Sequence, residues 1–131
     1  MTSLSAEIEL EISELSEEDA VVFMADLGIQ EPALHKLIRT SYELLGLISF
    51  FTVGEDECRS WTIRRGAKAQ QAAGVIHSDL EKGFIRAETV HYEDLIAQGN
   101  MHACRDKGLL RLEGKEYVVK DGDILNIRFN V

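Results

Sequence analysis

The chain has 131 residues, of which 45% are hydrophobic and 28% are charged, and its formal net charge at pH 7 is −9. This length and composition predict one ordinary packed domain with an extension at one end. No apolar run approaches the roughly 18 residues of a membrane span, and no basic start precedes an apolar signal region, so we expect a cytoplasmic protein without a membrane partner.

The acidic excess is confined to the amino end of the chain. Residues 1–35 contain nine acidic side chains and no Lys or Arg, whereas residues 36–131 contain 14 charges of each sign. Such a shift in composition predicts two parts, an acidic segment and an electrically neutral body. We interpret the acidic stretch as the solvated face of a helix, and mimicry or repulsion of nucleic acid is the alternative.

The two cysteines, Cys58 and Cys104, are far apart, without a Cys-x-x-Cys motif or a paired histidine spacing. This pattern argues against a disulfide framework and against a zinc site. We therefore expect reduced, structural thiols and no bound metal.

Apolar periodicity predicts the elements of the acidic segment. Apolar residues at positions 8, 10 and 12 alternate with glutamates, which indicates a strand, although glutamate is a poor strand former. Ser16 followed by Asp19 is typical of a helix N-terminus, and helical spacing before Gly28 predicts a helix over residues 17–27. A second helix is expected from Pro32 to the residue before Gly46.

The neutral body begins with an expected hairpin. Residues 47–53 (LISFFTV) form an apolar run between two glycines and predict a buried strand, and a turn at residues 54–56 leads to a second strand at residues 58–64. After a turn at Gly66, residues 68–73 are expected to be helical and to end at Gly74.

The rest of the chain carries short elements separated by glycines. Ser78 and Glu81 have the spacing of a capping box, and Gly83 stops that turn. The remaining expected elements are a strand at 84–90, helices at 92–98 and 101–107, and short strands at 109–112, 117–119 and 124–129. This order predicts an α+β fold of the β-grasp (ubiquitin-like) class, a mixed sheet around one helix, preceded by a helical segment.

Three long runs carry a specific resemblance: LIRTSYELLGLISFFTVG, RSWTIRRGAKAQQAAGVIHSDLEKGFIRAETVHYEDL and LRLEGKEYVVKDGDILNIRFNV. They resemble the carboxy-terminal part of the YchF family, the Obg-like GTPases/ATPases, over nearly all of the chain from Glu31 onward. The resemblance implies that residues 47–131 are a TGS domain, a β-grasp module also found in threonyl-tRNA synthetase and in (p)ppGpp synthetases/hydrolases.

The amino end resembles the end of the GTPase domain that precedes this module. Ser5, Ala6 and Glu7 lie where such domains carry their last guanine-loop motif, which implies that a backbone amide here helps to hold the purine base. Residues 1–46 are therefore expected to be the end of the GTPase domain and the linker.

The phosphate-binding motifs of nucleotide hydrolases are absent from the sequence. There is no Gly-x-x-x-x-Gly-Lys-Ser/Thr, no Asp-x-x-Gly and no Asn-Lys-x-Asp/Glu. We expect that the chain is not a complete family member and is not an enzyme. It should carry no cofactor of its own, although ATP or GTP and Mg belong to the full-length family. The partners that the resemblance implies are the parent GTPase domain and the ribosome or RNA, and no DNA is expected.

A basic cluster supplies the candidate RNA- or nucleotide-binding residues, because arginine offers paired donors to phosphate. The candidates are Arg64, Arg65, Lys68, Lys82 and Arg86, with Arg59 close by. The alternative is a solvated face in which Arg86 or Arg65 pairs with Glu88 or Glu81.

Aromatic and histidine residues are assigned mainly structural roles. Trp61 is expected in the core rather than as a base-stacking platform. One of Phe50 and Phe51 is expected to be exposed for an interface, His77 to order the turn before Ser78, and His102 and Cys104 to be a surface and a core residue.

The resulting hypothesis is a non-catalytic regulatory module that contacts the ribosome, RNA or a nucleotide and its own GTPase domain. The alternative is a stand-alone ubiquitin-like protein-interaction module without a nucleic-acid or nucleotide role. A sulfur carrier would need a Gly-Gly end where this chain has Phe129-Asn130-Val131, and a ferredoxin would need four cluster ligands.

Overall fold

The computed structural model describes residues 3–130. The chain divides into two compact units, and the boundary lies between Leu45 and Gly46. The expected identity of the first unit as the end of a GTPase domain stays a prediction. Met1, Thr2 and Val131 belong to expected segments but lie outside the described residues.

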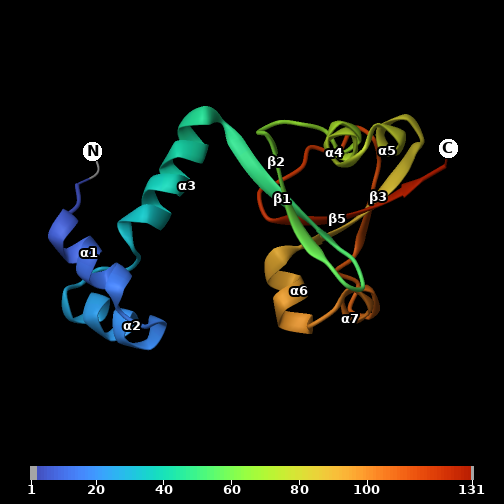
Figure 1. Ribbon diagram of the computed structural model, residues 1–131. Helices are drawn as coiled ribbons and strands as arrows, with labels where there is room; N and C mark the ends of the chain where they lie inside the picture. The colour runs from blue at the N-terminus through green and yellow to red at the C-terminus, as the bar shows by residue number, and fades with distance from the viewer. Residues whose placement is uncertain (1–2, 131) are drawn as a thin grey trace. The chain divides into compact units, whose positions relative to one another are not determined.

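The first unit consists of three helices, α1 (Ala6–Glu14), α2 (Glu17–Asp26) and α3 (Ala33–Leu45) (Figure 1). The strand expected from the alternation at residues 7–12 is wrong. Ser5 caps α1, because its Oγ accepts from the Ile8 amide at 3.4 Å, and the glutamates near this end favour the helix dipole. Positions 8 and 12 also lie one helical turn apart, and Ile12 is buried.

The predictions for the other two helices are confirmed. Ser16 caps α2 by accepting from the Asp19 amide at 3.3 Å, and Gly28 follows the helix with a φ of 70°. Pro32 precedes α3, which contains no buried residue.

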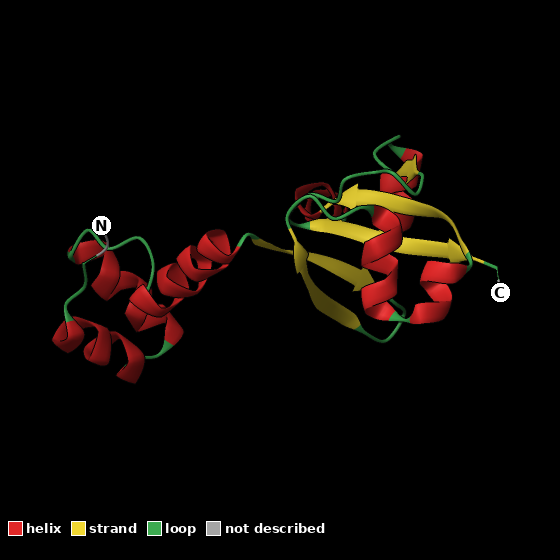
Figure 2. Cartoon of the chain, turned by 90° about the horizontal axis from the view of Figure 1, so that it is seen from above, coloured by secondary structure: helices red, strands yellow, loops and turns green. Residues whose placement is uncertain are grey.

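The second unit contains a five-stranded sheet in the order β2-β1-β5-β3-β4 (Figure 2). Strand β1 pairs in parallel with β5, and the other neighbours are antiparallel. The strands are β1 (Leu47–Val53), β2 (Cys58–Arg64), β3 (Phe84–His91), β4 (Arg111–Glu113) and β5 (Asp123–Phe129). This mixed sheet confirms the predicted α+β class and the β-grasp arrangement.

Helices cover both sides of this sheet. Figure 1 shows α4 (Ala69–Ile76) and α5 (Ser78–Lys82) on one side, and α6 (Tyr92–Gln98) and α7 (Met101–Asp106) on the other. The main core lies under α4, where Ala69, Ala72 and Ala73 have no exposed surface and belong to one cluster with Phe50 and Leu125. Alanines on this face allow a close approach of helix and sheet.

Two details around α4 differ from the predictions. Gly74 does not end the helix: a Cβ at this position would lie 2.5 Å from Oε2 of Glu81, so the glycine makes room for α5 inside the helix. The N-cap of α5 is His77 rather than Ser78, because its Nδ1 accepts from the Asp79 amide at 3.1 Å. The predicted role of His77 in ordering this turn is therefore confirmed.

The strand expected at residues 117–119 is wrong. Val118 forms an isolated bridge with Lys68. The Ala69 amide donates to the Tyr117 carbonyl at 2.8 Å, and the Val119 amide donates to the Ala67 carbonyl at 3.0 Å. This segment therefore pairs with the residues that lead into α4 instead of joining the sheet.

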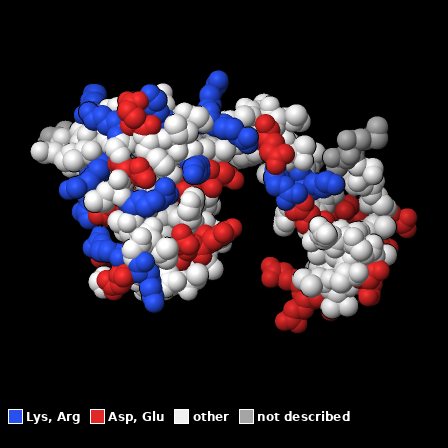
Figure 3. All heavy atoms as spheres, turned by 180° about the vertical axis from the view of Figure 1, so that it is seen from behind, with Lys and Arg blue, Asp and Glu red and all other residues white. Residues whose placement is uncertain are grey.

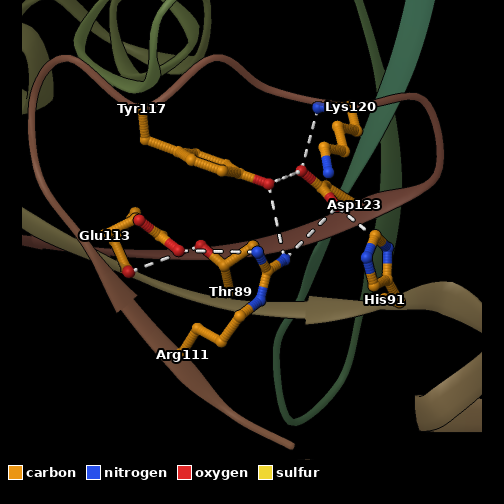
Figure 4. Close-up of polar contacts among 8 residues, drawn as sticks. Thr89, His91, Arg111, Glu113, Tyr117, Lys120 and Asp123 are labelled. Atoms are coloured by element: carbon orange, nitrogen blue, oxygen red, sulfur yellow. Dashed lines mark hydrogen bonds and ion pairs between the residues drawn. The ribbon is translucent and has the colours of Figure 1, made fainter.

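A buried carboxylate ties the loop after β4 to the start of β5 (Figure 4). Asp123 has no exposed surface, and its Oδ2 accepts from the Tyr117 hydroxyl at 2.7 Å and from the Lys120 amide at 2.9 Å. His91 Nδ1 lies 3.3 Å and Arg111 Nη2 lies 3.9 Å from its Oδ1. Burial, and then the hydrogen bond to Asp123, raise the pKa of Tyr117.

Removing the Tyr117 hydroxyl tests whether its hydrogen bond to Asp123 stabilises the fold. Tyr117→Phe leaves Asp123 with one fewer donor, and we expect the free energy of unfolding to fall by about 1–3 kcal/mol in urea titrations. Tyr92→Phe is the matched control, because Tyr92 is 51% exposed, and it should change stability by less than about 0.5 kcal/mol. Equal stability of the two variants would contradict the role of the hydroxyl.

The raised pKa of Tyr117 also predicts an alkaline pH dependence. A group whose pKa is higher in the folded state contributes stability below its unfolded pKa, about 10 for tyrosine, and loses it as pH rises through the folded pKa. The stability difference between the unaltered chain and Tyr117→Phe should therefore shrink above about pH 10. A difference that stays constant with rising pH would show that this hydroxyl is not perturbed.

Candidate nucleic-acid interface

Three of the predicted basic residues form one edge of the second unit, which we call the basic edge: Arg64, Arg65 and Lys68. Arg64 ends β2, Arg65 follows it and Lys68 is the N-cap of α4, and all three are exposed. Arg64 and Arg65 line a hollow of about 510 Å³. The other residues of this hollow are Leu47, Thr62, Ile63, Gly66, Ala67, Gln71 and Val75.

The backbone of this edge is fixed by a tight turn. The Arg65 amide donates to the Gly46 carbonyl at 2.7 Å, and the Ala67 amide donates to the Arg64 carbonyl at 3.0 Å. Gly66 takes a φ of 89°, a conformation that other residues rarely adopt. The two arginines therefore project from a defined backbone.

The three side chains of the basic edge differ in whether an acidic side chain pairs with them. The Lys68 ammonium is paired with Glu116, which offsets part of its charge. Within residues 3–130, neither Arg64 nor Arg65 takes part in an ion pair. The donors of these two guanidinium groups are therefore not used by an acidic side chain of the described residues.

Lys68 and the remaining two predicted residues do not line this hollow. Lys82 ends α5, and Arg86 lies on β3 opposite Arg128 of β5. Both are exposed. Figure 3 shows the Lys and Arg side chains of the second unit in several groups, with Asp and Glu between them.

The pairing of Glu88 with Arg86 or Arg65, considered as the alternative to a binding site, is not observed among the described residues. The Glu88 carboxylate accepts from Arg128 Nη2 at 2.9 Å and Nε at 3.2 Å, and from Arg105 Nη2 at 3.5 Å. Asn126 donates at 3.0 Å. Sequence reasoning missed Arg105 and Arg128, and the one available signal was the alternation along the last strand, which places Asn126 and Arg128 on one face.

The aromatic predictions have mixed outcomes. Trp61 packs against the core as expected, its Nε1 donates to Thr52 Oγ1 at 2.9 Å, and the Arg59 guanidinium lies 4.5 Å from its ring centre. Phe50 is buried, but Phe51 is half-buried and lies against Tyr92 rather than being exposed. The predicted placements of His102 at the surface and of Cys104 in the core are confirmed.

The motif Ser5-Ala6-Glu7 lies at the amino end of α1. Ser5 is the N-cap and lines a hollow of about 640 Å³ within the first unit, together with Lys36 and Arg39. Arg39 is paired with Glu31. The role of this motif in holding a purine base stays a prediction.

The sequence lacks the motif that holds the phosphates of a magnesium–nucleotide in nucleotide hydrolases. The sequence has no glycine-rich phosphate loop with its lysine. In the described part of the chain, no three His, Cys, Asp or Glu side chains are grouped so that they could hold a metal ion. None of the described helices combines the length and the apolar character that crossing a membrane requires.

Comparisons with known proteins identify the family of the chain. The family model YchF-GTPase_C, described as "Protein of unknown function (DUF933)", matches residues 47–130. The "Ribosome-binding ATPase YchF" of Bacillus subtilis (strain 168) is 58% identical over 126 residues, which are 96% of this chain and 34% of that protein. "Obg-like ATPase 1" of Homo sapiens is 45% identical over 96% of this chain and 32% of its own length.

A solved structure gives the same result. The Schizosaccharomyces pombe YchF GTPase superimposes with a TM-score of 0.76 at 47% sequence identity, over 90% of this chain and 31% of that one. The chain thus spans about one third of the relatives that it matches. It belongs to the YchF family, of which residues 47–130 form the carboxy-terminal domain.

Proposed function

We propose that this chain is a non-catalytic interaction module of a ribosome-binding nucleotide hydrolase, in which the basic edge contacts ribosomal RNA. The observation that carries the proposal is the pair of guanidinium groups of Arg64 and Arg65, which line one hollow. Arginine presents a planar set of five donors that matches phosphate oxygens.

The charge distribution supports a local contact rather than broad adhesion to nucleic acid. The chain has a net charge of −9, which would repel a polyanion from most of its surface. Binding therefore requires a place where cations are fixed close together and are not neutralised. Arg64 and Arg65 meet this condition, because they belong to a hydrogen-bonded turn, line one hollow and pair with no described acidic side chain.

The names of the relatives supply the class of partner. Curated relatives are called ribosome-binding ATPases, and the ribosome surface is rich in RNA phosphates. We assign ATP or GTP and Mg to the part of the full-length protein that this chain does not span, because the phosphate-binding motifs are missing here. We place the protein in the cytoplasm, with no DNA contact.

The first unit supports a contact with the preceding nucleotide-binding domain. Helix α3 exposes apolar residues along one stripe: Leu34 is 63%, Leu37 56%, Ile38 49% and Leu45 71% exposed. An apolar stripe at helical spacing normally lies against another element. The matched relatives are about three times as long as this chain, so their additional domain is the partner that we propose.

The alternative of a stand-alone ubiquitin-like module is less well supported. It predicts relatives of similar length, whereas the matched curated proteins are much longer and are named as ATPases. It also gives no use to the two arginines at the hollow.

Removing the two charges tests the proposal. Arg64→Gln combined with Arg65→Gln should lower the affinity of the chain for purified ribosomes in co-sedimentation by about tenfold, because two phosphate contacts are lost. Lys107→Gln combined with Lys115→Gln removes the same charge at other exposed positions and should leave the affinity within about twofold. Equal affinities of the two double variants would contradict the proposal.

A further inference from the structure

A second group of cations lies on the other side of the sheet, away from the main core. It consists of Arg105 on α7 and Arg128 on β5, which both contact Glu88, and of Arg86 on β3, which lies opposite Arg128; we call it the arginine cluster. Arg86 and Arg128 are direct neighbours in the register of β3 and β5. Like charges directly opposite each other on neighbouring strands destabilise a sheet. The position of Arg86 opposite Arg128 therefore requires an explanation.

Glu88 fixes two of the three guanidinium groups. Its side chain is 10% exposed, and its Oε1 accepts from both Arg128 and Arg105, while its Oε2 accepts from Asn126. Burial acts to raise the pKa of Glu88, but hydrogen bonds from Arg128 and Asn126 and the arginine charges outweigh it, so the pKa is lowered. Glu88 is therefore a stable anion at neutral pH.

One carboxylate cannot neutralise three guanidinium groups. Arg128 and Arg105 remain 54% and 56% exposed at their side chains, and Arg86 is exposed without an ion pair among the described residues. Each guanidinium has five N–H donors, of which Arg128 uses two and Arg105 uses one on Glu88. Against Glu88 alone the three arginines have an excess of two positive charges, of which Glu55 in the adjoining hollow offsets one. Glu88 holds the guanidinium groups of Arg105 and Arg128 in place, and both keep free donors.

Arg105 and Arg128 line a hollow of about 640 Å³ between the sheet, α7 and the β1–β2 turn. Glu55 is the second acidic residue that lines this hollow, beside Glu88, and part of the hollow's wall is apolar. Its other lining residues are Val53, Gly54, Glu88, Asn100, Met101, His102, Ile124, Leu125 and Asn126. Glu55 belongs to the β1–β2 turn, so an anion is favoured at the arginine end.

Two amide side chains in this hollow have unused hydrogen-bonding groups. Asn126 donates through Nδ2 to Glu88, which leaves its Oδ1 as an acceptor. Asn100 accepts through Oδ1 from the Ala103 amide at 2.7 Å, which leaves its Nδ2 as a donor. An acceptor and a donor beside apolar surface match the edge and the face of a nucleobase.

We propose that this hollow binds one nucleotide unit of single-stranded RNA, with its phosphates on the arginine cluster and its base or sugar against the amides and the apolar wall. This inference rests on the proposed function and adds a second contact on the opposite side of the sheet from α4. An acidic peptide would use the guanidinium groups but would leave both amides and the apolar wall without a role, so the chemistry favours RNA.

The test measures binding of a short, fluorescein-labelled single-stranded RNA to the full chain by anisotropy at several KCl concentrations. Arg86→Gln combined with Arg105→Gln should weaken binding by about tenfold and reduce the slope of log K against log [KCl] by about 1.4, because each phosphate contact contributes about 0.7. Arg128 is left unchanged because it holds the buried Glu88.

A second variant is expected to act in the opposite direction. Glu88→Gln keeps Oε1 as an acceptor for Arg128 but removes the negative charge, so RNA binding should become about threefold tighter at low salt. Circular dichroism and urea unfolding verify that the variant is folded. Weaker binding by the folded variant would overturn the proposal.

The control and the variants of the basic edge separate the possible outcomes. Lys107→Gln combined with Lys115→Gln should leave the RNA affinity nearly unchanged, and a loss equal to that of the cluster variant would overturn the inference. If only the Arg64 and Arg65 variant loses binding, the proposed function stands and the cluster has no role. If the unaltered chain binds an acidic peptide but no RNA, both proposals are wrong.

Discussion

The close contact between α4 and the sheet is the constraint on which the second unit depends. Ala69, Ala72 and Ala73 are fully buried against a core that includes Phe50, and larger side chains at these positions would push the helix away at a cost of about 1–3 kcal/mol. Lys68 caps this helix, so the position of α4 also determines where the chain leaves β2. The basic edge is thus a consequence of how the core is packed.

Two buried carboxylates organise cations in different ways. Asp123 is completely enclosed, and its contacts with Tyr117, Lys120 and the nearby Arg111 hold a loop in place. Glu88 lies under the surface, and its arginines remain more than half exposed at their side chains. The first arrangement stabilises the fold, because the Tyr117 hydroxyl and the Lys120 amide both donate to the enclosed carboxylate. The second positions free donors, which is what an anion-binding surface requires.

Local signals in the sequence predicted most of the elements but could not predict contacts between distant segments. The apolar run of β1 and the glycine that follows α6 were sufficient to place those elements. The alternation at residues 7–12 failed because apolar residues at 8 and 12 fit a helical turn as well as a strand. The space that Gly74 leaves for Glu81 and the pairing of Glu88 with Arg128, 40 residues away, depend on tertiary packing and strand register, which no local pattern records. Arg64 and Arg65 were predicted as candidates, whereas their separation from Arg86 became visible in the folded chain.

The most direct test of the account is an NMR titration of the isotope-labelled chain with a ribosomal RNA fragment, followed at each backbone amide, with ATP, GTP and ppGpp as comparison ligands. We expect saturable shifts with RNA at residues 64–68, which would show that the second unit binds RNA without another domain. Absence of shifts at these residues with RNA, while the fold is intact, would contradict the claim that the basic edge is a nucleic-acid contact.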